Sequence, residues 1–317
     1  MKISAIITTY NRASIVSEAI RSVFEQSLPP HELLIVDDGS SDDTREVVAS
    51  ILSDAPFPTQ YLFKPNGGMA SSLNYGFVRA VGDWVAFLDD DDLWDSNHLS
   101  RVNYLSQIHP ELGCIAGLRH EKGSLQKPPS NLLSAYLKSE RDPDLLIYRM
   151  SPLEHPFFTP VVGTSVVHKQ LLQKISFAPQ AGARLDIHFF WRLSEVSDIG
   201  LDLKSHGIAR QFRISLLSTD SNAPNEIKEQ IALKKNSDDI AMLRDLLINR
   251  SPLKCQDFFV MLQKSLIGRS YLLRGFGRYS QALQHTLGCF SECPFSWVAK
   301  ELLLATFRIS PRVKENS

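Results

Sequence analysis

The chain has 317 residues, of which 43% are hydrophobic and 22% charged, so it is long enough to bury one large core and to carry a second lobe. Its formal net charge of −1 gives no reason to expect nucleic acid as a partner. No window approaches 18 uninterrupted apolar residues, no signal peptide opens the chain, and the four cysteines match no zinc or redox spacing. These features predict a cytoplasmic globular protein.

The charge is unevenly distributed along the chain. Residues 250–317 contain ten Lys or Arg and four Asp or Glu, which gives this region a net charge of +6 and leaves −7 for the remainder. Its leucine-rich helical pattern would let this region rest on the inner face of an anionic membrane, which suits a lipid-linked acceptor. The same pattern is also explained by a lid, by a lobe that forms a dimer, or by simple drift of surface charge. The sequence does not predict the oligomeric state.

Strands alternate with helices in the first part of the chain. The strands are expected at residues 3–7, 33–36, 60–63, 84–88 and 113–117, and the helices at about 15–26, after Ser41, 69–80 and 96–108, with Ser14 and Ser41 as N-caps. Such alternation is typical of right-handed βαβ units and of a parallel sheet.

The rest of the chain becomes helical after a less regular stretch. Residues 118–160 are interpreted as an insertion, followed by a strand at 161–167, a helix at 169–175, a helix opening at Leu185, a strand at 208–214, and helices at about 226–248, 256–274, 278–290 and 296–308. We predict a first domain at 1–220, with a nucleotide-binding half (1–117) and an acceptor half (118–220), and a helical C-terminal lobe at 221–317.

A cluster of polar residues follows each of the first four strands. These clusters are Thr9-Tyr10-Asn11, Asp37-Asp38, Asn66-Gly67-Gly68 and Asp89-Asp90-Asp91-Asp92. The carboxyl ends of parallel strands line one crevice of a doubly wound sheet, and ligands bind there. We therefore expect the four clusters to converge on one ligand.

The acidic run Asp89–Asp92 indicates what that ligand is. Four adjacent carboxylates repel one another unless a cation offsets them, and Mg²⁺ or Mn²⁺ suits carboxylate and phosphate oxygens. A plain acidic loop is the alternative. The sequence has neither a dinucleotide fingerprint nor a P-loop, which favours a nucleoside diphosphate held by metal and carboxylates. Tyr10 would offer a flat face to its base, and Asp37 would accept a hydrogen bond from the base.

The first hundred residues resemble glycosyltransferase family 2, whose members have the Rossmann-like α/β fold called GT-A and use nucleotide-diphosphate sugars. Four stretches carry the resemblance, which continues more weakly to about residue 220: Ile6–Arg12, Ile35–Asp42, Asn66-x-Gly68 with Asn74-x-Gly76, and Phe87–Trp94. The implied architecture is a GT-A domain with a C-terminal helical extension.

The resemblance also implies roles for individual residues. Asp91 and Asp89 would form a D-x-D motif for Mg²⁺ or Mn²⁺, with Asp91 the more direct ligand, Asp90 the spacer and Asp92 a cap of the turn. The nucleotide, UDP by family habit, would lie against ten residues: Thr8, Thr9, Tyr10, Asn11, Arg12, Asp37, Asn66, Gly68, Asp89 and Asp90.

The family places its catalytic base in a Glu-Asp pair that opens a later helix, and Asp186 stands at that place. As a general base, Asp186 would deprotonate a hydroxyl of a glycan or lipid-linked acceptor while that hydroxyl attacks the sugar, which inverts the anomeric carbon. The alternative is a carboxylate that merely interacts favourably with the helix dipole.

Three positions depart from the family pattern. Ser72-Leu73 stand where Ala-Arg is common, Leu185 replaces the Glu of the Glu-Asp pair, and Ser215 replaces a His. The missing Arg removes a diphosphate contact unless one of three other cations replaces it: Lys64, Arg184 or Arg213. Two alternatives therefore stay open, an inactive nucleotide-sugar-binding paralogue and a haloacid-dehalogenase-type phosphohydrolase, which also has D-x-D after a strand.

Overall fold

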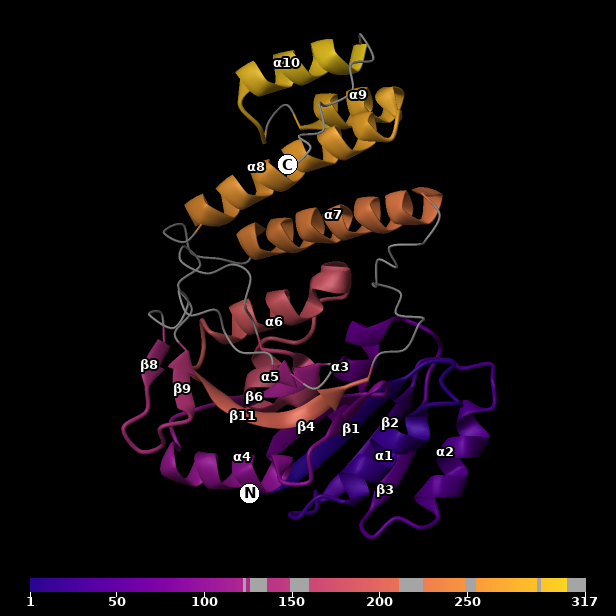
Figure 1. Ribbon diagram of the computed structural model, residues 1–317, viewed down its shortest axis with the longest axis vertical. Coiled ribbons are helices and arrows are strands. Elements are labelled where there is room, and N and C mark those ends of the chain that lie inside the picture. The colour runs from indigo at the N-terminus through magenta and orange to yellow at the C-terminus, as the bar shows by residue number, and fades with distance from the viewer. Residues whose placement is uncertain are drawn as a thin grey trace. The chain divides into compact units, whose positions relative to one another are not determined.

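The computed structural model of the protein describes residues 1–121, 124–125, 136–148, 160–210, 225–248, 255–289 and 292–306 (Figure 1). The chain forms two compact units. The first comprises Met1–Pro179 and Leu185–Ser215, and the second comprises Gln180–Arg184 and Leu216–Ser317. The division of the first unit into a nucleotide half and an acceptor half stays a prediction.

The first four predicted strands form the parallel half of one sheet. The elements are β1 (Ile3–Thr9), α1 (Val16–Phe24), β2 (Glu32–Asp37), α2 (Thr44–Leu52), β3 (Thr59–Phe63), α3 (Met69–Arg79) and β4 (Trp84–Asp89). The strands lie in the order β3-β2-β1-β4 and pair in parallel. The alternation of strands and helices therefore predicted this half correctly.

The other half of the sheet is mixed, so the expectation of a parallel sheet was wrong there. β10 (Ser165–His168) is antiparallel to both β4 and β6 (Cys114–Glu121), and β11 (Ile199–Ala209) is parallel to β6. Five shorter elements were not predicted or were predicted only in part: β5 (Asp92–Trp94), β7 (Ser124–Leu125), β8 (Tyr136–Lys138), β9 (Leu145–Tyr148) and the 3-10 turn Val162–Thr164.

The turn at Val162–Thr164 shortens the strand expected at 161–167 and has a steric cause. A Cβ on Gly163 would lie 2.9 Å from Asp89 Oδ2, so the chain passes close to the end of β4 only because this residue is glycine. The strand expected at 208–214 also begins earlier, at Ile199, and residues 211–214 lie outside the described part of the chain.

The two expected serine caps were wrong as well. Helix α1 begins after Ile15 and helix α2 after Asp43, so these residues hold the N-cap positions. The carboxylate of Asp42 accepts a hydrogen bond from the backbone N–H of Thr44 at 3.1 Å, and thereby satisfies a donor of the first turn of α2.

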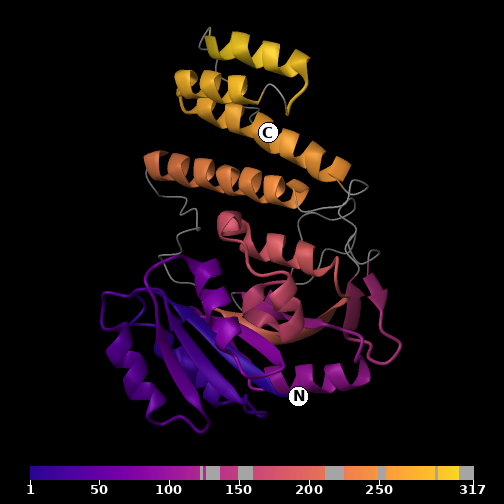
Figure 2. The same ribbon diagram turned by 180° about the vertical axis from the view of Figure 1, so that it is seen from behind.

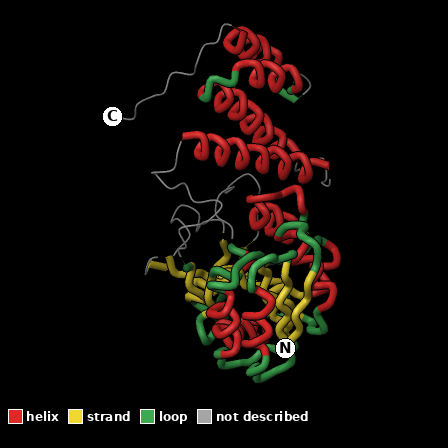
Figure 3. Tube along the Cα trace, turned by 90° about the vertical axis from the view of Figure 1, so that its right-hand side faces the viewer, coloured by secondary structure: helices red, strands yellow, loops and turns green. Residues whose placement is uncertain are grey.

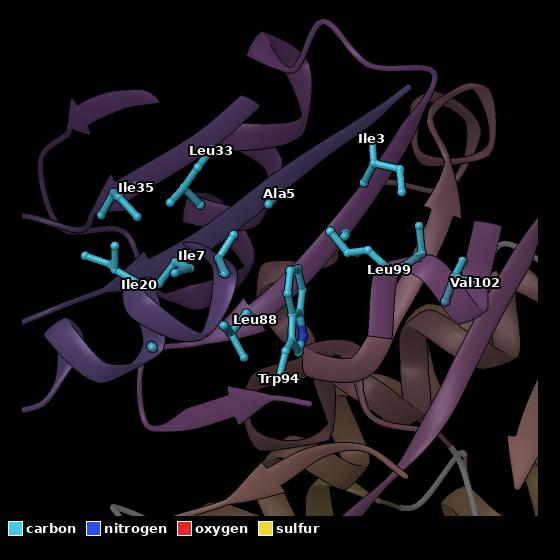
Figure 4. Close-up of a cluster of buried hydrophobic side chains, with 14 of the residues drawn as sticks. Ile3, Ala5, Ile7, Ile20, Leu33, Ile35, Leu88, Trp94, Leu99 and Val102 are labelled. Atoms are coloured by element: carbon cyan, nitrogen blue, oxygen red, sulfur yellow. The ribbon is translucent and has the colours of Figure 1, made fainter. Parts of the chain in front are cut away.

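Apolar side chains on both faces of the sheet are covered by helices. Ile3, Ala5 and Ile7 of β1 pack with residues of α1 and of α4 (His98–Ile108), as Figure 4 shows. Helix α3 lies on the opposite face, where a Cβ on Gly76 would come within 2.9 Å of Ile6 (Figure 2). Burial on both faces explains why β1 is a continuous apolar run.

The remaining helices complete both units. The first unit includes α5 (Lys169–Lys174) and α6 (Leu185–Leu193), and a 3-10 segment at Pro179–Arg184 precedes α6. The second contains α7 (Asn225–Ile248), α8 (Cys255–Gly275), α9 (Tyr279–Gly288) and α10 (Phe295–Thr306) (Figure 3), close to the predicted ranges. A buried ion pair joins Arg274 Nε to Glu301 Oε2 at 3.1 Å and ties α8 to α10.

Among the described helices, none has the combination of length and apolar composition needed to cross a membrane. Several basic residues behind the predicted membrane contact lie outside the described part of the chain, including Arg308, Arg312 and Lys314. Peripheral membrane contact through the tail therefore stays a prediction.

Candidate active site

The carboxyl ends of the parallel strands meet in register. Thr8 lies opposite Asp89 of β4, Thr9 lies opposite Asp37 of β2, and Asp37 lies opposite Phe63 at the end of β3. The polar clusters that follow these strands therefore start from one edge of the sheet, as the sequence predicted.

Asp38, the second carboxylate of the acidic pair at the end of β2, is neutralised by the protein itself. Asp38 is 5% exposed and forms an ion pair with Lys64, while its oxygens also accept hydrogen bonds from the N–H groups of Gly67 (2.9 Å) and Gly68 (2.7 Å). Burial raises the pKa of Asp38, but these donors outweigh it and hold the pKa below its usual value. Lys64 is thus committed to Asp38 instead of replacing the missing diphosphate arginine.

Asp37, the predicted base-binding residue, is fully buried at the end of β2. Its Oδ1 accepts a hydrogen bond from the N–H of Ser40 at 2.7 Å, and its Oδ2 accepts one from the hydroxyl of Tyr61. Burial and the hydrogen bond with Asp37 raise the pKa of Tyr61, so this phenol stays a donor. A carboxylate oxygen has two lone pairs, which leaves Asp37 further accepting capacity.

The loop after β1 presents one aromatic ring to solvent. Tyr10 is 49% exposed, as stacking on a base requires. Asn11 adopts a positive φ of 52°, and its Oδ1 accepts a hydrogen bond from the N–H of Ser41 at 2.8 Å, which fastens this loop to the one after β2. Arg12 Nε lies 3.9 Å from Asp90 Oδ1.

Three carboxylates of the acidic run lie together. One oxygen from each of Asp89, Asp91 and Asp92 falls within 4.8 Å of the others, while Asp90 faces Arg12 instead. Burial and the charges of Asp92, Asp186 and Asp91 raise the pKa of Asp89 well above its usual value. Crowded carboxylate oxygens of this kind fit a hard divalent cation, which would offset their repulsion.

Asp92 does more than cap the turn. It opens β5, lies with the two predicted metal ligands, and forms an ion pair with Arg119 whose Nη1–Oδ2 distance is 2.6 Å. The charge of Arg119 also lowers the pKa of Asp89, against the larger effects of burial and of the neighbouring carboxylates.

Asp186 comes to the same place from a distant part of the sequence. It lies in the first turn of α6, and its Oδ1 accepts a hydrogen bond from the N–H of Val162 at 3.2 Å. Its charge is close enough to raise the pKa of Asp89, and burial raises the pKa of Asp186 itself. Leu185, where the family has Glu, is buried at 5% exposure.

Asn74, which belongs to the Asn74-x-Gly76 stretch of the family resemblance, hydrogen-bonds to the protein backbone. The side-chain amide of Asn74 donates to the carbonyl of Phe177 at 2.8 Å and accepts from its N–H at 2.9 Å. Gly68, with φ 82°, precedes α3, and Asn66 is exposed. Of the other candidate diphosphate cations, Arg184 pairs with Asp239 at 2.5 Å, while Arg213 lies outside the described residues, as does Ser215.

Two arginines at the site were missed by sequence reasoning. Arg119 follows the apolar residues that open strand β6, and the change from apolar to charged residues there was a usable signal. Arg210 follows β11 and donates to the carbonyls of Asp90 and Asp91, a contact that no local pattern indicates.

The sheet order and the helices that cover the sheet give this part of the chain the GT-A architecture. Solved structures with that architecture match most of the chain at low identity. TarS 1–349 of S. aureus in complex with UDP-GlcNAc matches 96% of this chain and 90% of its own, with 16% identity and a TM-score of 0.57. The mannosyltransferase PcManGT of Pyrobaculum calidifontis in complex with GDP-Man and Mn²⁺ matches 96% and 79%, with 17% identity and a TM-score of 0.56.

Residues 4–172 match the family described as glycosyl transferase family 2, and the chain belongs to that family. An uncharacterized glycosyltransferase of Rickettsia prowazekii is 30% identical over 72% of this chain and 68% of its own length. One of Nostoc is 42% identical over 36% of each chain. The match covers 36% of the length of the Nostoc relative and 36% of the length of a Mycoplasma pneumoniae relative. The chain thus spans about a third of the length of these two relatives.

Proposed function

We propose that this chain transfers a sugar from a nucleoside diphosphate to a hydroxyl of a glycan or lipid-linked acceptor, with inversion of the anomeric carbon. The observation that carries the proposal is the arrival of Asp186 beside the Asp89–Asp92 turn. This reaction needs one carboxylate that takes the proton of the acceptor hydroxyl. It also needs several carboxylates that bind a metal ion next to the diphosphate. Family membership leaves the phosphohydrolase alternative without support.

The donor would be held by the strand ends. Tyr10 would stack on the base and Asp37 would accept a hydrogen bond from it, while Thr8, Thr9, Asn11, Arg12, Asn66 and Gly68 shape the loops around the nucleotide. Asp90, with Arg12 beside it, would lie next to the ribose and diphosphate. Both UDP-GlcNAc and GDP-mannose are donors to test, because solved proteins of this fold bind them.

Asp89, Asp91 and Asp92 would hold Mg²⁺ or Mn²⁺. Bound there, the cation would act as a Lewis acid toward the diphosphate leaving group. Because Arg119 already pairs with Asp92, we assign the direct contacts to Asp89 and Asp91 and give Asp92 a supporting place.

Asp186 would take the proton of the acceptor hydroxyl. The hydroxyl oxygen bonds to the anomeric carbon as the bond from that carbon to the diphosphate oxygen breaks, and the proton ends on the Asp186 carboxylate. Burial raises the pKa of Asp186 and so strengthens it as a proton acceptor. The N–H of Val162 keeps the carboxylate oriented.

The test is a donor screen on the full chain. UDP-GlcNAc, other UDP-sugars and GDP-mannose are added with and without Mn²⁺, and the unfolding midpoint and the release of nucleoside diphosphate are followed with glycan and lipid-linked acceptors. We expect one donor to raise the midpoint only when Mn²⁺ is present, because a ligand of the folded state stabilises it by mass action. Nuclear magnetic resonance of the product should show the opposite anomeric configuration.

Binding without release on every acceptor would identify an inactive paralogue. Stabilisation by none of the donors would contradict the proposal as a whole. Retention of the anomeric configuration would overturn the role of Asp186.

A further inference from the structure

Arg210, the residue directly after β11, holds the backbone of the acidic turn. Its Nε donates a hydrogen bond to the carbonyl oxygen of Asp91 at 3.1 Å, and its Nη2 donates to the carbonyl oxygen of Asp90 at 2.9 Å. The pairing of Ala209 with Asp92 brings Arg210 to this turn.

The same guanidinium reaches the loop on the nucleotide side of the sheet. Its Nη2 also donates to the carbonyl oxygen of Ile15 at 3.1 Å, and its Nη1 lies 2.9 Å from Oε2 of Glu18 in the first turn of α1. The Arg210 side chain is 11% exposed, so its bonds to the backbone carbonyls are largely shielded from water, while Glu18 lies at the surface. One planar group thus joins the end of β11, the acidic turn and the start of α1.

We propose that Arg210 is a positioning residue that sets the direction of the metal-binding carboxylates. The carbonyl of Asp90 belongs to the peptide plane before Asp91, and the carbonyl of Asp91 belongs to the plane after it. Peptide units are planar, so fixing both planes fixes φ and ψ of Asp91 and the direction of its Cβ. This inference rests on the metal assignment of the proposed function.

The geometry requires an arginine at this position. A guanidinium presents five N–H donors in a rigid fork; here Nε and Nη2 donate to three carbonyls, and Nη1 lies beside the Glu18 carboxylate. A lysine ammonium is a point charge on a flexible stem and cannot reproduce that spread of contacts. Partners that orient metal ligands typically change metal affinity by 10- to 100-fold when they are removed.

The chain offers a matched control for this arginine. Arg141 also donates to a backbone carbonyl, that of Ile108 at the end of α4, and also pairs with a glutamate, Glu111, at 3.6 Å. Arg141→Met therefore removes bonds of the same kinds away from the acidic turn.

The experiment compares Arg210→Met, Arg210→Lys, Arg141→Met and the wild type as full chains. Mn²⁺ affinity is measured by electron paramagnetic resonance without nucleotide, and hydrogen exchange is measured on peptides that cover residues 86–95. We expect Arg210→Met to bind Mn²⁺ at least tenfold more weakly and to exchange faster in those peptides, with Arg141→Met unchanged. Arg210→Lys should unfold at the same midpoint as Arg141→Met. Its Mn²⁺ affinity should still be lower than that of the wild type.

Wild-type Mn²⁺ affinity and wild-type exchange in Arg210→Met would overturn the inference. Parallel recovery of stability and Mn²⁺ affinity in Arg210→Lys would also overturn it, because that result makes Arg210 structural only. A wild type that binds no Mn²⁺ contradicts the proposed metal site instead, and the exchange rates then decide the positioning role alone.

Discussion

Two acidic strand ends flank β1 in the sheet, and they differ in what offsets their charge. After β2, Asp38 is surrounded by donors of the protein, with Lys64 and two backbone N–H groups bound to its oxygens. After β4, Asp89 faces other carboxylates, including Asp186, and its pKa is raised. Both strand ends belong to the same sheet and carry aspartates. Asp38 is surrounded by hydrogen-bond donors, whereas Asp89 is surrounded by other carboxylates.

The difference shows how a structural carboxylate and a ligand-binding one are told apart. A carboxylate whose acceptors are filled by the protein stabilises the fold and needs nothing further. A group of carboxylates that raise one another's pKa costs folding free energy, which a bound cation or substrate can offset. By this criterion Asp38 holds loops together, and the turn at Asp89–Asp92 is the proposed site.

The largest expected effect comes from Asp186→Asn, which removes a charge from the crowded site. We expect the transfer rate to fall about 10²- to 10⁴-fold, the range for a positioned general base. Because burial raises the pKa of Asp186, the amide should not lower the unfolding midpoint. Product formation at saturating donor and calorimetric donor binding check these expectations.

The control for this variant is Asp54→Asn, an exposed carboxylate after α2. Both variants should bind donor like the wild type. Near wild-type turnover in Asp186→Asn would mean that the carboxylate only interacts with the dipole of α6.

The second prediction applies the same substitution at the neutralised strand end. Asp38→Asn leaves the ammonium of Lys64 buried at 8% exposure without its counter-charge, and the free energy of unfolding should fall by about 3 kcal/mol. Chemical denaturation without metal measures the loss. A double variant with Lys64→Met should recover part of the lost free energy of unfolding. A loss under about 0.5 kcal/mol in Asp38→Asn, the size of ordinary surface substitutions, would mean that Asp38 does not differ from a surface carboxylate.

The third prediction has the opposite sign at the crowded strand end. Asp89→Asn removes a carboxylate whose pKa is raised by burial and by like charges, so the unfolding midpoint without metal should rise by a few degrees. Added Mn²⁺ should raise the midpoint of the wild type and leave that of Asp89→Asn where it was. Equal responses to Mn²⁺ would remove Asp89 from the metal site.

The parallel half of the sheet was predictable because its signals are local. The apolar runs of β1 and β4 encode burial on both faces, and the carboxyl ends of parallel strands meet at one edge. The positions of Tyr10, Asp37 and the acidic run at that edge therefore followed from chain order.

The partners of those carboxylates were not predictable in the same way. Arg119 and Arg210 reach the acidic turn through the pairing of β6 with β11 and of β11 with β5, which joins segments that are far apart in the sequence. A strand was expected where β10 lies, but its antiparallel direction has no local signature. Residue identity thus located the charges, and tertiary pairing determined which of them are neutralised.

The smallest expected effect concerns the support behind the crowded turn. Where β5 pairs with β11, Nδ1 of His98 lies 2.7 Å from Nδ1 of His206, and Nε2 of His206 lies 2.9 Å from Oδ2 of Asp202. The two facing nitrogens need one donor and one acceptor, so this contact requires an unprotonated Nδ1. Burial first, and His206 second, lower the pKa of His98 well below its usual value.

The sign of the pH dependence follows from that lowered pKa. Below pH about 6.5, His98 takes up a proton in the unfolded state but not in the folded state. As the pH is lowered, this residue therefore decreases the free energy of unfolding by up to about 1.4 kcal/mol per pH unit. His98→Asn keeps a polar atom toward His206 and removes the titration. Urea unfolding at pH 7.5 and 5.5 should therefore show a difference in unfolding free energy between wild type and variant that narrows by about 1 kcal/mol at the lower pH. A constant difference would mean that His98 takes up its proton equally in the folded and unfolded states.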